Sequence, residues 1–217
     1  IFEIPVDFVV KQINCCLSDI GANTIKIGMM HNSELINGVY EALKNNEIIG
    51  NKNIKIVLDP VMVAKGGHRL LKEDAVNSLI KFIKNTTPVL TPNIPEAEIL
   101  TKMKINNLAD MKTAAEKIID LGANYVVLKG GHMNTSTMSD LLIGKEVFDQ
   151  IDTKKLKTNN THGTGCTMAS ALAAGLAKSL DIKVAFQKAH FYVNQAIIAS
   201  PRFGNGHGPI NHSFNIN

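Results

Sequence analysis

The sequence predicts an α/β fold in three layers, with a mainly parallel central sheet between helices and an antiparallel edge. Short apolar runs rich in β-branched residues recur along the chain, and such runs are typical of strands buried on both faces. Segments with helical periodicity separate these runs, and this alternation favours a parallel sheet. A later stretch, residues 140–158, changes to short alternating segments with turns, which is typical of antiparallel strands.

Each expected strand of the parallel part is short and ends at a polar residue or at glycine. The segments are residues 24–29, 54–59, 88–91 and 125–129. In the antiparallel part we expect turns at Gly144-Lys145 and at Asp152-Thr153, and we read the first residues as the tail of a strand that enters a helix at Val6.

The expected helices lie between these strands and after the antiparallel part, and several carry recognisable end signals. Asn32 or Ser33 and Asp181 are suited to cap helix starts, and Gly122 is suited to close a helix. The helices are predicted at residues 33–46, 73–85, 110–121, 163–179 and 182–200.

Composition predicts one domain over residues 1–217 and excludes several classes of function. The chain is 45% hydrophobic, which suffices for a substantial core. Its formal charge of +4 comes from scattered lysines, and with no Trp and three Tyr there is little basis for nucleic-acid binding. No apolar stretch approaches the roughly twenty residues that span a membrane, so we expect no membrane partner and a cytoplasmic location. Three cysteines, two of them adjacent, predict reduced thiols and no disulfide framework.

A glycine turn, residues 161–166 (THGTGC), is the most informative segment of the chain. It precedes a run of small residues that reads as a helix, so the backbone N–H groups of Gly163, Thr164, Gly165 and Cys166 would meet the positive end of the helix dipole. That arrangement favours binding of a phosphate group and therefore phosphoryl transfer. We expect the same dipole to lower the pKa of the Cys166 thiol.

Six segments, taken in order and spacing, resemble the hydroxymethylpyrimidine and phosphomethylpyrimidine kinases, which are the thiamin-biosynthetic branch of the ribokinase-like fold. They are KIGMM, LDPVMVAKGG, LTPNIPEAE, VVLKGGH, NTHGTGCTMASALAAGLA and GNGHGP. The resemblance covers essentially the whole chain. It implies that ATP phosphorylates 4-amino-5-hydroxymethyl-2-methylpyrimidine and then its monophosphate, and that the enzyme is a homodimer. The family's amino-terminal strand, glycine-rich substrate loop and next strand do not appear in this sequence, so we expect that the beginning of the protein is absent from it.

The resemblance assigns roles to particular residues. Many sugar kinases of this fold place an aspartate base where Cys166 stands, so the thiol is expected to act as a base or to position the hydroxymethyl group. A buried cysteine without a chemical role is the structural alternative. Asp59 and Glu96, with Asn93, offer hard oxygen atoms for Mg²⁺, mainly through water. Alternatively, Asp59 only ends a strand, and Asn93 and Glu96 only cap a helix.

The remaining candidates concern the nucleotide and the ring of the acceptor. Lys129 is placed to meet nucleotide phosphate together with Thr164, and Lys188 matches a family position close to ATP, although a solvated lysine on a helix face fits as well. Met29 and Val61 are expected to pack on the pyrimidine ring; the alternative is that both belong to the hydrophobic core and have no role in binding. His132, His162, His207 and His212 match no compact metal-ligand spacing, and the loop of residues 204–209 is expected to close near the nucleotide.

Two other functions stay open at this point. Some pyridoxal kinases look very similar, including the GTGC turn, and they differ in pocket residues that this sequence largely lacks. A regulatory or structural module that binds nucleotide without catalysis is the more distant alternative.

Overall fold

The computed structural model describes residues 2–63, 70–72, 74–132 and 136–216. Within them six strands form one sheet in the sequential order β1-β2-β3-β4-β5-β6. Strands β1 to β4 pair in parallel, whereas β5 and β6 are antiparallel, which confirms the predicted mixed sheet. The strands are β1 (Thr24–Ile27), β2 (Lys55–Leu58), β3 (Val89–Leu90), β4 (Tyr125–Leu128), β5 (Thr137–Gly144) and β6 (Phe148–Lys154).

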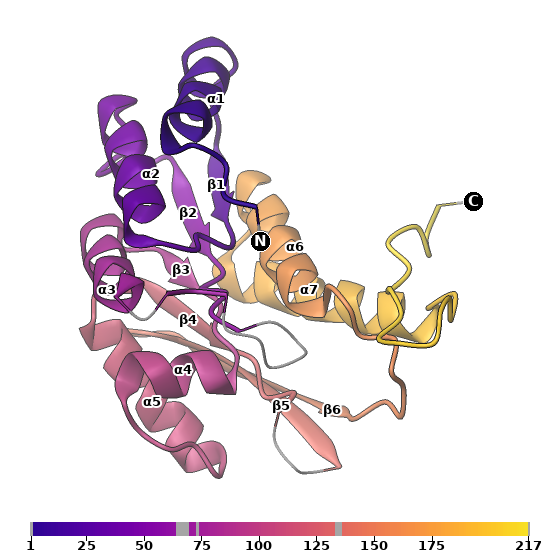
Figure 1. Cartoon of the computed structure of the whole chain (residues 1–217). Coiled ribbons are helices and arrows are strands. Elements are labelled where there is room, and N and C mark those ends of the chain that lie inside the picture. The colour runs from indigo at the N-terminus through magenta and orange to yellow at the C-terminus, as the bar shows by residue number, and fades with distance from the viewer. Residues whose placement is uncertain (1, 64–69, 73, 133–135, 217) are drawn as a thin grey trace.

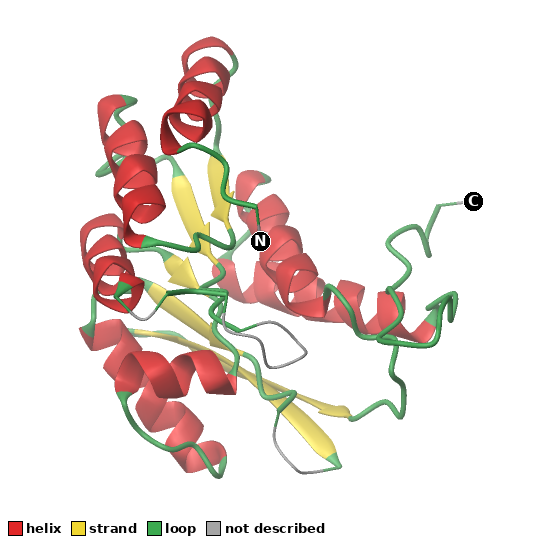
Figure 2. Ribbon diagram, in the orientation of Figure 1, coloured by secondary structure: helices red, strands yellow, loops and turns green. Residues whose placement is uncertain are grey.

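Helices cover both faces of the sheet (Figures 1 and 2). Right-handed crossovers that always step in the same direction place their helices on one face, so α2, α3, α4 and α5 share that face. Helices α6 and α7 follow β6 and cover the opposite face. The described helices are α1 (Val6–Asp19), α2 (Ser33–Asn45), α3 (Ala75–Thr86), α4 (Ile94–Thr101), α5 (Leu108–Asp120), α6 (Thr164–Ala177) and α7 (Ile182–Ile198).

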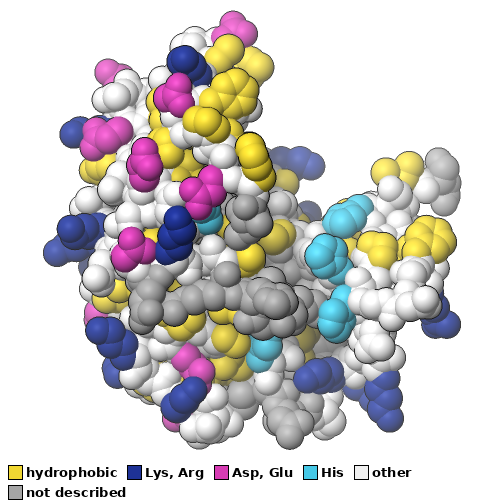
Figure 3. All heavy atoms as spheres, in the orientation of Figure 1, with side chains coloured by type: hydrophobic (Ala, Val, Ile, Leu, Met, Phe, Trp, Pro, Cys, Tyr) yellow, Lys and Arg dark blue, Asp and Glu magenta, His cyan; other side chains and the backbone are white. Residues whose placement is uncertain are grey.

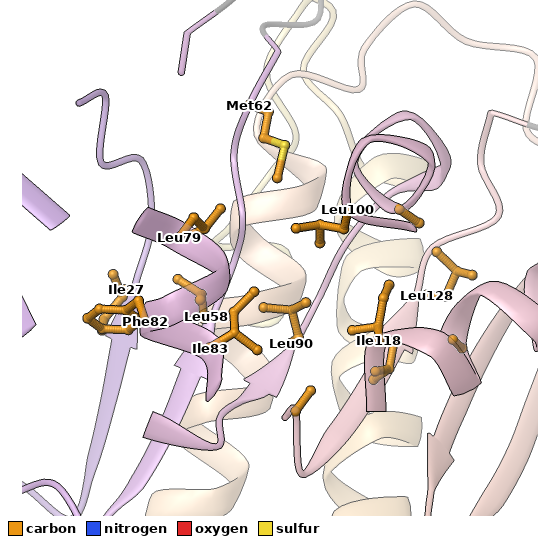
Figure 4. Close-up of a cluster of buried hydrophobic side chains, with 14 of the residues drawn as sticks. Ile27, Leu58, Met62, Leu79, Phe82, Ile83, Leu90, Leu100, Ile118 and Leu128 are labelled. Atoms are coloured by element: carbon orange, nitrogen blue, oxygen red, sulfur yellow. The ribbon is translucent and has the colours of Figure 1, made fainter. Parts of the chain in front are cut away.

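The hydrophobic core has two parts because neighbouring residues of a strand point to opposite faces of the sheet. Leu58 and Leu90 pack with Phe82 of α3 on one face (Figure 4). Val57, next to Leu58, packs with Phe186 of α7 on the other face. Burying such a side chain fully contributes roughly 1.5–3 kcal/mol, so both helical layers are held to the sheet by the strands themselves.

The structure corrects two local predictions and shifts the ends of several elements. Asp152 and Thr153 do not form a turn; they lie inside β6, where they pair with Ser139 and Met138. Polar residues alternate there because β6 is an edge strand with its outer side in solvent. Residues 2–5 do not form a strand, although α1 does begin at Val6.

The surface bears mixed charges. On the face shown in Figure 3, basic and acidic side chains are interspersed, without a stripe of one sign. Cys15, Cys16 and Cys166 are free and exposed. No helix in the described ranges is both long enough and apolar enough to cross a membrane.

Candidate active site

Several of the predicted site residues meet where the carboxyl ends of the parallel strands face the start of α6. Helix α6 packs on β1 and β2. Lys129 follows β4, and its Nζ lies 3.0 Å from Oδ1 of Asp59, which follows β2. A Cβ added at Gly165 would lie 3.2 Å from the same Lys129 Nζ. The glycine turn, Lys129 and Asp59 therefore come together, as expected for ligand-binding residues at the carboxyl edge of a parallel sheet.

The first turn of α6 is open to a ligand. Gly163 is the N-cap in the left-handed conformation, with φ of 84°, which favours glycine, and no side chain caps the helix. In the described part of the chain, the backbone N–H groups of Thr164, Gly165 and Cys166 have no hydrogen-bond acceptor. The Thr164 hydroxyl donates backwards to the carbonyl of Thr161 at 3.1 Å. Unpaired N–H groups at a helix start form an anion-binding site.

The carboxyl-terminal segment supports this turn from behind. The backbone N–H of His162 donates to the carbonyl of Gly208 at 3.1 Å, and His162 forms an isolated bridge with Pro209. One turn into α6, Oγ1 of Thr167 lies 3.0 Å from Nε2 of His212. The loop that the sequence suggested near the nucleotide is thus joined to the glycine turn itself.

Cys166 stands in the first turn of α6, but its thiol differs from the expectation. Although Cys166 is exposed as a residue, protein atoms around its thiol partly exclude water and so disfavour the thiolate. This partial burial and the repulsion from the Asp59 carboxylate raise the pKa of Cys166 above its ordinary value of 9.0. The positive charges of Lys26 and Lys129 oppose this effect without reversing it. The predicted lowering of the pKa is therefore wrong, and the sulfur is protonated near neutral pH.

Asp59 is held in one place by two donors. Its carboxylate is 2% exposed, and it accepts from the Lys129 ammonium at 3.0 Å and from the Thr91 hydroxyl at 3.3 Å. Lys129 is fixed at both ends, because its backbone N–H donates to the carbonyl of Pro92 at 2.9 Å. The sequence suggested Asp59 and Lys129 separately, whereas the pairing and the part played by Thr91 come from the sheet.

Asn93 and Glu96 form a capping box at the start of α4. The Asn93 side chain accepts from the N–H of Glu96 at 2.9 Å, and Oε2 of Glu96 accepts from the N–H of Asn93 at 2.8 Å. Burial raises the pKa of Glu96 to about 7, against the opposing charge of Lys129. The capping role is thus seen directly. No group of three or more His, Cys, Asp or Glu residues in the described ranges could hold a metal ion by itself.

A buried polar chain that the sequence reasoning missed supports the loop after β4. The N–H of Gly130 donates to Oδ1 of Asp140 at 2.9 Å, and Oδ2 of Asp140 lies 3.0 Å from Nδ1 of His190. Nε2 of His190 lies 2.7 Å from the Thr153 hydroxyl on β6. Asp140 and His190 are both buried, and each lies on a different element, so periodicity along the chain could not have revealed this network.

The other candidates are more scattered. Met29 follows β1 and is 43% exposed, and Val61 follows β2 and is partly buried, whereas Met62 belongs to the core. Lys188 is exposed on α7, and within the described ranges no hydrogen bond or ion pair joins it to the other candidates. A solvated helix-face lysine therefore remains an adequate description of Lys188.

Comparison with known proteins adds independent findings. The family model described as phosphomethylpyrimidine kinase matches residues 1–211. The hydroxymethylpyrimidine/phosphomethylpyrimidine kinase of Bacillus subtilis is 39% identical over 213 residues, which are 98% of this chain and 77% of that protein.

Two solved structures agree with this match. A pyridoxal kinase of Bacillus subtilis, in complex with ADP, superposes with a TM-score of 0.88 at 33% identity over 100% of this chain and 80% of its own. A phosphomethylpyrimidine kinase of Clostridium difficile gives a TM-score of 0.76 at 36% identity over 90% of this chain and 78% of its own. The fold expected from the sequence, ribokinase-like with an antiparallel edge, is confirmed by these structures. The chain belongs to the phosphomethylpyrimidine kinase family, and it is a kinase.

Proposed function

We propose that this kinase transfers the γ-phosphoryl group of ATP to 4-amino-5-hydroxymethyl-2-methylpyrimidine and then to the resulting monophosphate. The observation that carries the proposal is the uncapped start of α6, whose unpaired N–H groups lie beside Lys129 and Cys166. Preorganised N–H donors stabilise negative charge that develops in a transition state. Phosphoryl transfer depends on such positioning and electrostatics more than on covalent help from the protein.

In this proposal each residue of the turn has a stated task. The N–H groups of Gly163, Thr164, Gly165 and Cys166 bind the equatorial oxygens of the transferring phosphoryl group. The Lys129 ammonium binds phosphate oxygens of the nucleotide from the opposite side. The bond from the γ-phosphorus to the β-phosphate oxygen breaks while the acceptor oxygen bonds to phosphorus, and ADP leaves with the electron pair of the broken bond. When the acceptor is the hydroxymethyl group, its hydroxyl proton is released to water as the new bond forms.

The raised pKa of Cys166 favours positioning over general-base catalysis. A protonated thiol donates a weak hydrogen bond and fills space beside the hydroxymethyl oxygen. It takes up a proton from the acceptor only after losing its own, and burial together with Asp59 opposes that loss. We therefore assign Cys166 to orientation of the acceptor.

The oxygen donors near the site fit a magnesium ion that is held mostly by phosphate and water. Asp59 and Asn93 already serve Lys129 and the α4 cap, and Glu96 is buried, so these side chains cannot form an all-protein cage. Mg²⁺ usually keeps several waters and binds few protein ligands. When bound with ATP, the ion would neutralise charge on the phosphates, and Asp59 and Glu96 would hold it through water. Asn93, Thr164 and Lys188 would contact the nucleotide.

The acceptor ring is assigned to the side chains that follow β1 and β2. Met29 is exposed although it is apolar, which suits a side chain that meets a flat ring in the complex. Val61, which follows β2, is partly buried. From the family resemblance we also expect a homodimer in the cytoplasm, and light scattering after size-exclusion chromatography tests the oligomeric state.

Pyridoxal is the second candidate acceptor, and one observation favours it. The pyridoxal kinase of Bacillus subtilis superposes with the higher TM-score of the two structures compared, 0.88 against 0.76. Both acceptors present a hydroxymethyl group on a flat heteroaromatic ring, so the glycine turn serves either one. Family membership favours a kinase over the non-catalytic nucleotide-binding module.

The experiment that decides between these acceptors is a parallel turnover assay. ADP release and product formation are measured with hydroxymethylpyrimidine, its monophosphate and pyridoxal under identical conditions. The proposal expects kcat/KM to be highest for the two pyrimidines. A clear preference for pyridoxal, with no formation of the pyrimidine diphosphate, would contradict it.

A further inference from the structure

Lys26, a residue that the sequence reasoning left without a role, points from β1 toward the glycine turn. It pairs in register with Val57 of β2, which packs on the α6 and α7 side of the sheet. Its neighbours Ile25 and Ile27 pack into the core on the opposite side. Because side chains alternate along a strand, Lys26 extends into the layer between the sheet and α6.

Gly28 makes room for the lysine head group at the end of the strand. Residues 26 and 28 point to the same face, and a Cβ at Gly28 would lie 2.8 Å from Lys26 Nζ. The ammonium thus occupies the space that a side chain at residue 28 would fill. This position is the carboxyl end of β1, close enough to Cys166 for the positive charge to act on the thiol.

The carboxylates near the glycine turn do not engage Lys26 within the described ranges. Asp59 is the carboxylate that acts on Cys166, and its Oδ1 is already bound by Lys129 at 3.0 Å. In the described ranges no ion pair or hydrogen bond engages the Lys26 ammonium. The start of α6 adds further positive potential through its unpaired N–H groups. Glu96 also interacts with Lys129. Among the residues that the structure describes, Lys26 is therefore the cation of this site that no carboxylate binds.

We propose that Lys26 determines specificity for the second phosphorylation, because its ammonium binds the phosphate group of the pyrimidine monophosphate when that group is the acceptor. This inference rests on the proposed function. In that step an oxygen of the acceptor phosphate bonds to the γ-phosphorus, the bond from that phosphorus to ADP breaks, and ADP carries away the electron pair. A phosphate dianion has no proton to lose, so the step requires charge neutralisation and not a base.

The two acceptors of the proposed sequence differ in the charge at the reacting oxygen. The hydroxymethyl group is neutral, whereas the monophosphate brings close to two negative charges into a site where ATP is already bound. A lysine placed beside the acceptor offsets the repulsion between the two phosphates. Charge-assisted hydrogen bonds of this kind are about twice as strong as neutral ones. A kinase that stops at the monophosphate has no such need.

The test compares Lys26→Met with Lys55→Met, a matched control. Lys55 starts the neighbouring strand β2 at the opposite end of the sheet, where its ammonium donates to the carbonyl of Lys52 at 2.8 Å in an exposed position. At saturating ATP, kcat/KM is measured for hydroxymethylpyrimidine and for its monophosphate. The ratio compared is kcat/KM for the monophosphate divided by kcat/KM for hydroxymethylpyrimidine. We expect this ratio to fall at least about tenfold in Lys26→Met and to stay close to the wild-type value in Lys26→Arg, which keeps the positive charge.

Two outcomes would overturn the inference. Equal losses for the two acceptors would mean that Lys26 serves the fold or the nucleotide, and an unchanged ratio would mean that the phosphate binds elsewhere. Titration calorimetry with the pyrimidine monophosphate, without nucleotide, tests the role of Lys26 in phosphate binding independently of turnover. The inference requires that the wild-type protein bind the monophosphate at least about tenfold more tightly than Lys26→Met does. A wild-type enzyme that phosphorylates only pyridoxal yet passes this binding test contradicts the proposed function and leaves the role of Lys26 in phosphate binding intact.

Discussion

Replacing Gly165 by alanine should separate stability from turnover, because the two depend on different neighbours of this residue. Alanine favours a helix by up to about 1 kcal/mol over glycine. Its Cβ would lie 3.2 Å from Lys129 Nζ, a contact tight enough to move the ammonium by a few tenths of an ångström. Stretching the Lys129–Asp59 pair from 3.0 Å by about 0.4 Å weakens the attraction by about 0.6 kcal/mol at an effective dielectric constant of 20.

These two effects nearly cancel, so the free energy of unfolding of Gly165→Ala should change by less than about 1 kcal/mol. Turnover should nevertheless fall, because the new methyl group and the displaced ammonium both disturb the anion-binding turn. We expect a loss in kcat of about tenfold for Gly165→Ala and about a hundredfold or more for Gly165→Val, whose branched side chain obstructs the N–H groups further.

The assay pairs urea unfolding with steady-state kinetics per folded molecule, and Gly175→Ala is the control in the same helix. A Cβ at Gly175 would lie 3.0 Å from the Cβ of Ala185 and 3.3 Å from its backbone Cα, which cannot move aside easily. The control should therefore lose about 1–3 kcal/mol of stability while its kcat is retained. Normal kcat in a folded Gly165→Val variant would refute the assignment of the phosphate site.

Three further predictions concern neighbouring residues. Cys166→Ala should lower kcat by about two powers of ten, because the acceptor oxygen loses its positioning contact, with KM for ATP nearly unchanged; an unaltered kcat would remove the thiol from the mechanism. Because burial raises the pKa of Glu96 from 4.5 to about 7, the folded state binds a proton there more tightly than the unfolded state does, and the contribution of Glu96 to stability declines as pH rises from about 4.5 to about 7. Glu96→Gln should flatten the dependence of the free energy of unfolding on pH in this range. A pH dependence identical to that of the wild type would count against the raised pKa. Lys129→Met leaves Asp59 buried without its cation and should lower the free energy of unfolding by about 3–5 kcal/mol, a loss that Lys129→Met combined with Asp59→Asn should largely recover in chemical denaturation.

Much of the fold could be predicted from the sequence because its signals are local. Buried parallel strands are continuous apolar runs, and the helix starts at Asn32 and Asp181 carry caps whose side chains accept from Leu35 and Lys183. The two wrong readings, a turn at Asp152-Thr153 and a strand before Val6, fall where solvent contact or sparse packing weakens the hydrophobic pattern. Cys166 shows the same limit for chemistry, because a helix dipole is local whereas the burial and the carboxylate that raise its pKa are not.

By itself the sequence determined the elements, their order, and the glycine turn, because backbone geometry and hydrophobic periodicity are written in neighbouring residues. Only the tertiary structure decided which charges meet. Asp59 pairs with Lys129, 70 positions away along the chain. The Lys26 ammonium lies next to Gly28 at the carboxyl end of β1, and Asp140 binds His190. Electrostatic interactions act through space and depend on burial, so they are determined by how the strands and helices pack. Local sequence patterns do not reveal which residues this packing brings together.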